Sequence, residues 1–206
     1  ASGTIWVDME ATGVDVLISA PQKGWSSTPG VAMVMLSARA RAAIDATQST
    51  SFAIDLKKWL QIMEAYEKGG HAYHATMPTD ALARLRDTMK ETADWGFDRA
   101  KAAQQELGRK ARAMLAKHGY RSVAAKGFEA PGVVVSYTDD PDVQSARKFI
   151  AEGLQTAAGV PLQCDEGPDF KTFRVGLFGL DKLRNVDRTV SNLERALEHL
   201  HPAHAP

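Results

Sequence analysis

Apolar and polar positions along the first third of the chain predict two strands followed by helices. VDVLISA (14–20) and VAMVMLS (31–37) are short, nearly continuous apolar runs of the kind that is buried between two layers of helices. The turn residues WSSTPG separate them. A helix is expected over SARARAAIDA, with Ser37 as its cap, and another over 54–70, ended by Gly69 and Gly70.

Beyond residue 71 the pattern predicts helices around a small sheet. Helices are expected from Thr79–Asp80, over roughly 97–118, over 142–159 and in a closing segment near the end of the chain. A strand, a turn and a second strand, VVVSYT (133–138), are expected over 123–138. Further strands are expected at FKTFRVGLFG (170–179) and, as an edge strand, at VPLQCDEG (160–167). The apolar stripe of the closing helix consists of Val186, Val190, Leu193, Leu197 and Leu200.

The order of these elements predicts an α/β part followed by a smaller α+β part. We place the boundary near Gly70–His71, which gives one unit over 1–70 and a second over 71–206. The second unit is expected to pack helices on a small, mostly antiparallel sheet. The chain starts ASGTIWVD, without an initiator methionine, and we therefore expect it to be a fragment.

Composition excludes several functional classes. Lysine plus arginine and aspartate plus glutamate number 25 each, so no net field attracts nucleic acid or a membrane surface. The chain has neither an apolar run that could span a bilayer nor a signal-peptide pattern at its start. Cys164 is the single cysteine, which excludes an internal disulfide and a thiolate cluster for a metal. We expect no metal, and a reducing, cytoplasmic location.

Lys23 lies directly after the first apolar run, between Pro21 and Gly24. Chemistry in α/β proteins concentrates just outside the carboxyl ends of strands. A lysine amine in such a place can form imines with carbonyl compounds when its surroundings lower its pKa. Gln22 would add an amide next to it, and Gly24 would let the backbone come close to a flat ligand. Taken alone, however, most lysines of this kind are ordinary surface groups.

Two other stretches carry candidate chemistry. Arg174 interrupts an apolar strand, where an unpaired guanidinium is costly. It therefore pairs either with a protein carboxylate, which the sequence alone favours, or with a carboxylate ligand. The loop AYHATMP places Tyr73, His74 and Thr76 before a helix start, which suits phosphate, although taken alone the stretch is better explained as an ordinary polar loop before a helix.

Taken together in order and spacing, these stretches resemble the class V aminotransferases. The lysine segment DVLISAPQKGWSSTPGVAMVMLS, the loop YHATMP, the strand RVGLFG and the helix NVDRTVSNLERAL all match motifs of that family. These are pyridoxal-phosphate enzymes of fold type I, and the alanine–glyoxylate and serine–pyruvate aminotransferases look most similar. The likeness covers residues 1–200. It implies that 1–70 ends the large cofactor domain and that 71–206 is the small C-terminal domain.

The resemblance also implies roles for single residues. Lys23 would be the Schiff-base lysine that holds pyridoxal 5'-phosphate and moves the proton at the substrate Cα. Gln22 would lie near the cofactor ring, and Tyr73 and Thr76 would reach the phosphate of the partner subunit in a homodimer. Arg174 would clamp the substrate carboxylate. The family's ring-nitrogen aspartate and phosphate-binding turn fall upstream of Ala1, so we expect the missing N-terminal half to be a necessary partner.

These implications predict the C-terminal portion of an aminotransferase that is inactive by itself. The complete enzyme would move an amino group from a small amino acid, alanine or serine, to a 2-oxo acid, glyoxylate or pyruvate. A lyase or desulfurase of class V is an alternative, but a desulfurase needs a mobile cysteine, and Cys164 falls in a segment expected to be ordinary small-domain structure. A catalytically silent dimerisation module is the remaining alternative.

Overall fold

The computed structural model describes residues 3–200. The start of the chain at Ala1, on which the expectation of a fragment rests, and the end of the predicted second unit at 201–206 lie outside them. The N-terminal part contains α1 (Met9–Thr12), β1 (Val16–Ser19), β2 (Met33–Leu36), α2 (Ala38–Ala46) and α3 (Leu56–Glu67). The rest contains α4 (Thr79–Trp95), α5 (Phe97–Lys117), β3 (Val133–Tyr137), α6 (Pro141–Gln144), α7 (Arg147–Ala151), β4 (Ala157–Ala158), β5 (Thr172–Gly176), α8 (Leu180–Arg184) and α9 (Val186–Leu200).

The predicted helix starts are made by side-chain caps. Ser37 accepts a hydrogen bond from the Ala40 amide at α2, and Asp55 accepts one from the Lys58 amide at α3. Gly69 has a φ of +79° just past α3, a conformation that glycine adopts without strain. These helices therefore begin and end where the sequence predicts.

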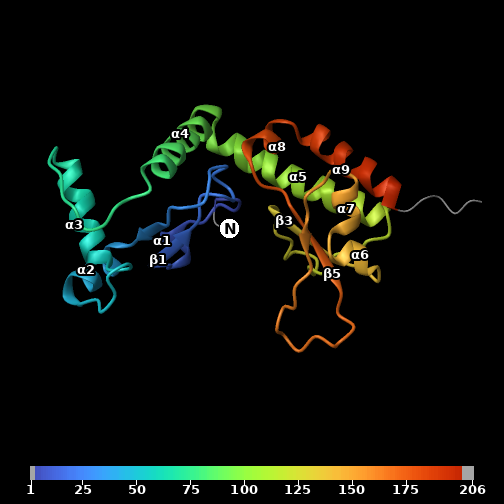
Figure 1. Ribbon diagram of the computed structural model, residues 1–206, viewed down its shortest axis with the longest axis horizontal. Helices are drawn as coiled ribbons and strands as arrows, with labels where there is room; N and C mark the ends of the chain where they lie inside the picture. The colour runs from blue at the N-terminus through green and yellow to red at the C-terminus, as the bar shows by residue number, and fades with distance from the viewer. Residues whose placement is uncertain (1–2, 201–206) are drawn as a thin grey trace, which may run out of the picture.

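β1 and β2 form an antiparallel two-stranded sheet in which Leu17 pairs with Met35. The expected burial between two layers of helices is not found among the described residues. In β1, Val16 and Ile18 are exposed, Leu17 is half-buried and Ser19 is buried, and the side chain of Ile18 is 67% exposed. In Figure 1, α2 and α3 lie at one end of the molecule, and the larger helical part lies at the other.

The second sheet has the strand order β3–β5–β4, with both pairings antiparallel. Long helices α5 and α9 pack on it (Figure 1). Alternate residues of β5 point into this core, where Phe173 and Leu177 are 0% and 1% exposed. The main cluster of buried apolar side chains runs from Leu107 to Leu200, so the core of the described chain lies in its C-terminal part.

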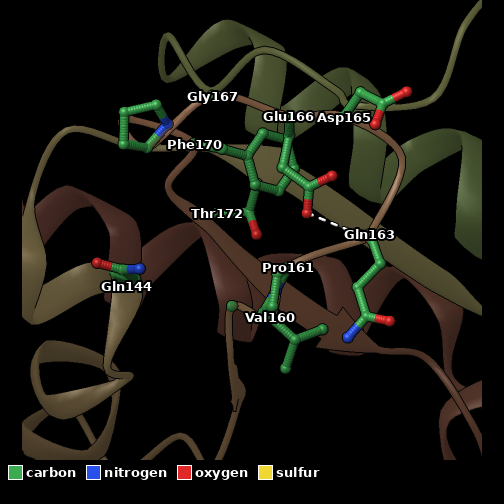
Figure 2. A pocket seen from close by; sticks show the side chains of 11 residues that line it. Gln144, Val160, Pro161, Gln163, Asp165, Glu166, Gly167, Phe170 and Thr172 are labelled. Carbon is green, nitrogen blue, oxygen red and sulfur yellow. Dashed lines mark hydrogen bonds between the residues drawn. The ribbon is translucent and has the colours of Figure 1, made fainter.

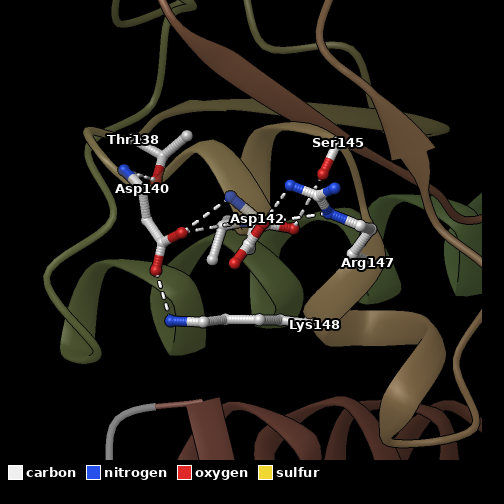
Figure 3. Close-up of polar contacts among 7 residues, drawn as sticks. Thr138, Asp140, Asp142, Ser145, Arg147 and Lys148 are labelled. Carbon is white, nitrogen blue, oxygen red and sulfur yellow. Dashed lines mark hydrogen bonds and ion pairs between the residues drawn. The ribbon is translucent and has the colours of Figure 1, made fainter.

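Two predicted elements are wrong. The helix expected over 142–159 is broken into α6 and α7, because Ala146 between them has a φ of +65°. Figure 3 shows the polar contacts that fix this corner: Asp140 caps α6 through the amides of Asp142 and Val143, and its other oxygen pairs with Lys148 of α7. The guanidinium of Arg147 in α7 likewise donates to the carboxylate of Asp142 in α6. The short strand β4 then uses residues that the prediction had assigned to the helix.

The edge strand expected over 160–167 is a loop instead. Pairing with β5 stops at Ala158, and the chain then projects away from the sheet until it returns at Thr172 (Figure 1). The strand–turn–strand expected over 123–138 is likewise reduced to β3, which is preceded by a single bridge between Ser122 and Ser136.

Candidate functional site

Lys23 lies in the loop that joins β1 to β2, and this loop is fixed against the C-terminal part of the chain. The amide of Ser27 donates to Pro21 O at 3.1 Å, which closes the loop on itself. Ser26 accepts a hydrogen bond from the amide of Leu180, the first residue of α8, at 2.7 Å. Trp25 packs edge-to-face against Phe97, with ring centroids 6.3 Å apart. These contacts place a loop of the N-terminal part beside the end of β5.

Gly24 permits a close approach between backbones. A Cβ at this position would lie 2.3 Å from the carbonyl carbon of Gly3 and 2.7 Å from the amide of Thr4. The sequence suggested that this glycine makes room for a flat ligand. In the structure it makes room for the chain's own segment at residues 3–4.

The Lys23 amine faces an aromatic ring. Its Nζ lies 5.2 Å from the centroid of the Phe178 ring, within the range of a cation–π interaction. Among the residues that the structure describes, no carboxylate forms an ion pair with this amine. The side chain is half-buried, whereas Gln22 next to it is exposed.

Arg174 lies at the centre of the second sheet, on the face opposite the helices. It sits between Val135 of β3 and Ala157 of β4, and its Nε donates to Ala158 O at 2.9 Å. Within residues 3–200 no carboxylate pairs with its guanidinium. The sequence alone favoured a structural ion pair for Arg174, and no such pair is present in this part of the chain. Its two Nη groups are therefore available to a ligand.

Lys23 and Arg174 are linked through Phe178. Arg174 and Gly176 share one face of β5, about 7 Å apart along the strand. The Phe178 ring folds back onto that face, since a Cβ at Gly176 would lie 3.2 Å from its Cε2. The ring is thus near the amine on one side and near the strand position of the guanidinium on the other. Phe178 was not predicted as a site residue, although it follows Arg174 by four positions and so has the same parity.

Tyr73 and Thr76 lie together in the loop between α3 and α4. Their hydroxyl oxygens are 3.1 Å apart, and the Tyr73 side chain is 77% exposed. His74 turns the other way: its Nε2 is 2.9 Å from Phe52 O, and its ring packs between Phe52 and Trp59. No described contact joins this loop to Lys23. His74 anchors the loop, and the two hydroxyls remain at the surface.

The loop between β4 and β5 has a fixed shape. The Glu166 carboxylate accepts hydrogen bonds from the amides of Gln163 and Cys164, each at 2.8 Å, and these bonds are the main cause that lowers the pKa of Glu166 to about 2. Figure 2 shows the depression of about 520 Å³ that this loop forms with Gln144 and Thr172. Cys164 is exposed on this loop, not held in a strand as the sequence had suggested.

The curated proteins similar to this chain include several aminotransferases. The chain is 26% identical over 201 residues to alanine–glyoxylate aminotransferase of Oryctolagus cuniculus, covering 93% of this chain and 49% of that protein. It is 27% identical over 201 residues to 2-aminoethylphosphonate–pyruvate transaminase of Burkholderia ambifaria, covering 96% and 52%. The chain spans about half the length of the curated relatives it matches. No protein-family profile matches it.

Solved structures share the fold. Alanine–glyoxylate aminotransferase from Nostoc sp. superposes with a TM-score of 0.79 at 22% identity, over 96% of this chain and 51% of that one. An aspartate aminotransferase from Thermus thermophilus gives a TM-score of 0.74 at 22% identity, over 97% and 53%.

The fold is that of the pyridoxal-phosphate-dependent transferases. Within that class, the chain is a relative of the class V aminotransferases and matches their C-terminal half. Its aminotransferase relatives and neighbours are enzymes that depend on pyridoxal phosphate. The resemblance stated from the motifs is confirmed. The aminoethylphosphonate–pyruvate transaminases, which are as similar as the alanine–glyoxylate enzymes, were not anticipated.

Two structural features are absent from the residues that the structure describes. None of the helices in residues 3–200 has the length and apolar character required to cross a membrane. In the same part of the chain, no three histidine, cysteine or acidic side chains come close enough together to hold a metal ion.

Proposed function

We propose that this chain supplies the amine and the carboxylate clamp of a pyridoxal-phosphate-dependent aminotransferase. The transferred amino group would come from a small amino acid, alanine or serine, and would go to a 2-oxo acid, glyoxylate or pyruvate. The observation that carries the proposal is the guanidinium of Arg174, which has no carboxylate partner among the described residues and shares one face of the sheet with the ring beside Lys23.

The donor set fits the cofactor. An amine without an ion-pair partner is suited to hold an aldehyde covalently, and a guanidinium with free Nη groups is suited to hold a carboxylate through two parallel hydrogen bonds. When bound, pyridoxal phosphate supplies the electron sink that stabilises negative charge at the substrate Cα. Gln22 would contact the ring from the exposed side of the loop.

Each residue of the chain then has a separate task. Arg174 binds the substrate α-carboxylate and so orients the Cα toward the amine. Lys23 Nζ would take the proton from that Cα and deliver it to the cofactor carbon that keeps the amino group. Phe178 and the half-buried loop keep water away from one side of the amine, which favours proton transfer to the substrate over exchange with solvent.

Tyr73 and Thr76 would act in a second subunit. Both hydroxyls are exposed and lie together, without a described contact to Lys23 of the same chain. We propose that in a homodimer they donate hydrogen bonds to the phosphate of the partner's cofactor. The ring-nitrogen aspartate and the phosphate-binding turn would come from a segment that corresponds to the other half of the relatives.

The single cysteine agrees with a cytoplasmic location.

Reductive labelling tests the proposal. The chain is combined with a polypeptide that corresponds to the other half of its relatives, incubated with pyridoxal 5'-phosphate, reduced with borohydride and mapped by peptide mass spectrometry. The label is expected on Lys23 ahead of exposed lysines such as Lys126. The chain alone should transaminate negligibly, and activity should appear when a polypeptide corresponding to the other half is added. Label spread evenly over the surface lysines would remove the assignment.

A second candidate function has one observation in its favour. Cys164 is an exposed thiol on the loop that leads into the strand of Arg174, which is a place where a mobile sulfur nucleophile of a desulfurase could act. Cys164→Ser separates the two functions. Transamination by the assembled site should be unchanged, whereas release of sulfide from cysteine, measured with dithiothreitol as the reductant of the enzyme persulfide, that disappears in this variant would favour the desulfurase.

A further inference from the structure

The Phe178 ring packs closely against the backbone of two glycines. A Cβ at Gly176 would come within 3.2 Å of the ring, and one at Gly132 would come within 3.0 Å of it and within 2.8 Å of Thr4 Cβ. Both positions therefore need glycine for the ring to lie where it does. These two glycines come from β5 and from the residue just before β3, so the ring covers the point where the two strands begin to separate.

The backbone that carries Phe178 is fixed from several directions. Gln104 of α5 is buried, and its Nε2 donates to Leu177 O at 3.1 Å and to Pro131 O at 2.9 Å. Lys182 Nζ donates to Phe178 O at 2.9 Å. With Ser26 bound to the Leu180 amide, the lysine loop and the aromatic residue are held to the same short stretch of chain. The distance between the ring and the amine is therefore set by the fold.

An aromatic face attracts an ammonium and packs against its methylene stem. Lys23 has no ion pair among the described residues, so the ring is the interaction that defines where its amine points. Since the ring also lies over Gly176, the amine is held on the side of the sheet that carries Arg174. A leucine would fill much of the same space but would lack the electrostatic attraction.

We propose that Phe178 is a positioning residue, whose ring holds the amine of Lys23 over the face of the sheet from which Arg174 projects. This role rests on the proposed function, because it matters only where amine and guanidinium act on one ligand. The class of ligand is an amino acid whose carboxylate and amino group must reach these two groups together.

Three variants test the proposal on the 206-residue chain. Phe178→Leu keeps apolar bulk and loses the ring, and Phe178→Tyr keeps the ring. Phe128→Leu is the matched control, because that side chain is 84% exposed and belongs to the loop before β3. Circular dichroism checks that each variant is folded.

The first measurement needs no cofactor. The lysines are reductively methylated with ¹³C-formaldehyde, and the Lys23 signal is assigned with Lys23→Arg. Its methyl resonance is expected to show an upfield ring-current shift in the unchanged chain, in Phe178→Tyr and in Phe128→Leu. The shift should disappear in Phe178→Leu. A resonance that is the same with and without the ring would overturn the proposal.

The second measurement uses pyridoxal 5'-phosphate with borohydride on the chain combined with the polypeptide that corresponds to the other half of the relatives. The share of label on Lys23, relative to Lys126, should fall about threefold or more in Phe178→Leu and stay unchanged in the other two variants. Equal labelling of Lys23 in Phe178→Leu and in the unchanged chain would overturn the positioning role and leave the proposed function standing. Absence of label on Lys23 in the unchanged chain would instead overturn the proposed function, and the ring-current shift would still decide whether Phe178 holds the amine.

Discussion

At the scale of single residues, Arg174 shows how a charge in an apolar strand can be accommodated. One of its donors is satisfied by Ala158 O, and the rest of the guanidinium is left on the face of the sheet that carries no helix. A lysine could not replace it without loss, because its ammonium has no planar fork with two parallel donors. This arrangement supports the proposal that Arg174 serves recognition of a carboxylate more than stability.

Arg174→Lys should consequently impair the binding of amino acids and leave the amine intact. In an assembled site we expect the half-reaction rate with alanine or serine to fall about tenfold or more, because the second hydrogen bond to the carboxylate is lost. Labelling of Lys23 by pyridoxal phosphate should persist. Arg188 is an exposed partner of Asp181, so Arg188→Lys is the control. It should leave the half-reaction rates with alanine and with serine unchanged. Unchanged single-turnover rates with both amino acids would mean that Arg174 has a structural role only.

Glu166 supports a prediction on pH dependence. Its pKa is lowered from 4.5 to about 2 by backbone amides that bind the ionised form, so the carboxylate stabilises the loop fully above pH 4.5. That contribution should decline as the pH falls from 4.5 and be absent below about 2. The amide proton shifts of Gln163 and Cys164, followed by NMR, should titrate with a midpoint near 2.

Two variants sharpen this measurement. Glu166→Gln should abolish the titration of both amides, whereas Asp165→Asn, the exposed neighbour, should leave it in place. A midpoint close to 4.5 would show that the carboxylate does not hold the loop in solution.

At the scale of elements, the sequence indicates where a helix begins or ends wherever the chemistry of a single residue determines that boundary. Ser37, Asp55 and Gly69 mark helix boundaries through hydrogen bonds or a positive φ that each residue type provides by itself. The break at Ala146 carries no such mark. It depends on Asp140 bridging to Lys148, which is a contact between two elements.

The site was predictable to a similar extent. Lys23 and Arg174 could be proposed as site residues from the sequence, since Lys23 closely follows an apolar run and Arg174 interrupts one. The role of Phe178 could not, because it depends on a loop from the first part of the chain meeting the end of the last strand. The loop over 160–167 was assigned to a strand because its apolar start resembles one. In the structure the Glu166 carboxylate accepts hydrogen bonds from the backbone amides of Gln163 and Cys164, which a strand would need for pairing.

The contact between α5 and the start of β3 gives a prediction about packing. A methyl group at Gly108 would lie 2.7 Å from Pro131 O and 2.8 Å from Pro131 Cα, and neither backbone atom can move aside cheaply. Gly108→Ala should lower the free energy of unfolding by about 1–3 kcal/mol, measured by urea denaturation, in spite of the better helix propensity of alanine. Gln105→Ala, on the exposed face of the same helix, should stay within about 0.5 kcal/mol. A gain in stability for Gly108→Ala would contradict the packing.

At the scale of the whole molecule, burial is distributed unevenly. The buried apolar cluster lies between Leu107 and Leu200, whereas Ala40 is the one hydrophobic residue of the described part of 1–70 in the buried class. Several large apolar side chains of that first part are instead exposed, among them Trp6, Ile18, Phe52 and Ile54. Such a surface is typical of a segment that packs against further structure.

Hydrogen exchange should therefore divide the chain into two parts. β3, β5, α5 and α9 close one core, so their amides should open only through global unfolding of that core and exchange about 100-fold more slowly than those of β1, β2 and α3. A two-stranded sheet is marginal by itself, and the β1–β2 sheet has no third strand among the residues that the structure describes. Because self-association could cover the exposed Ile18 face, the exchange is measured by mass spectrometry at two protein concentrations tenfold apart. Slow exchange in β1 and β2 that is independent of concentration would mean that the first part is stable without a partner. Adding the polypeptide that corresponds to the other half of the relatives should slow exchange in β1 and β2 selectively, while α5 and α9 stay as they are.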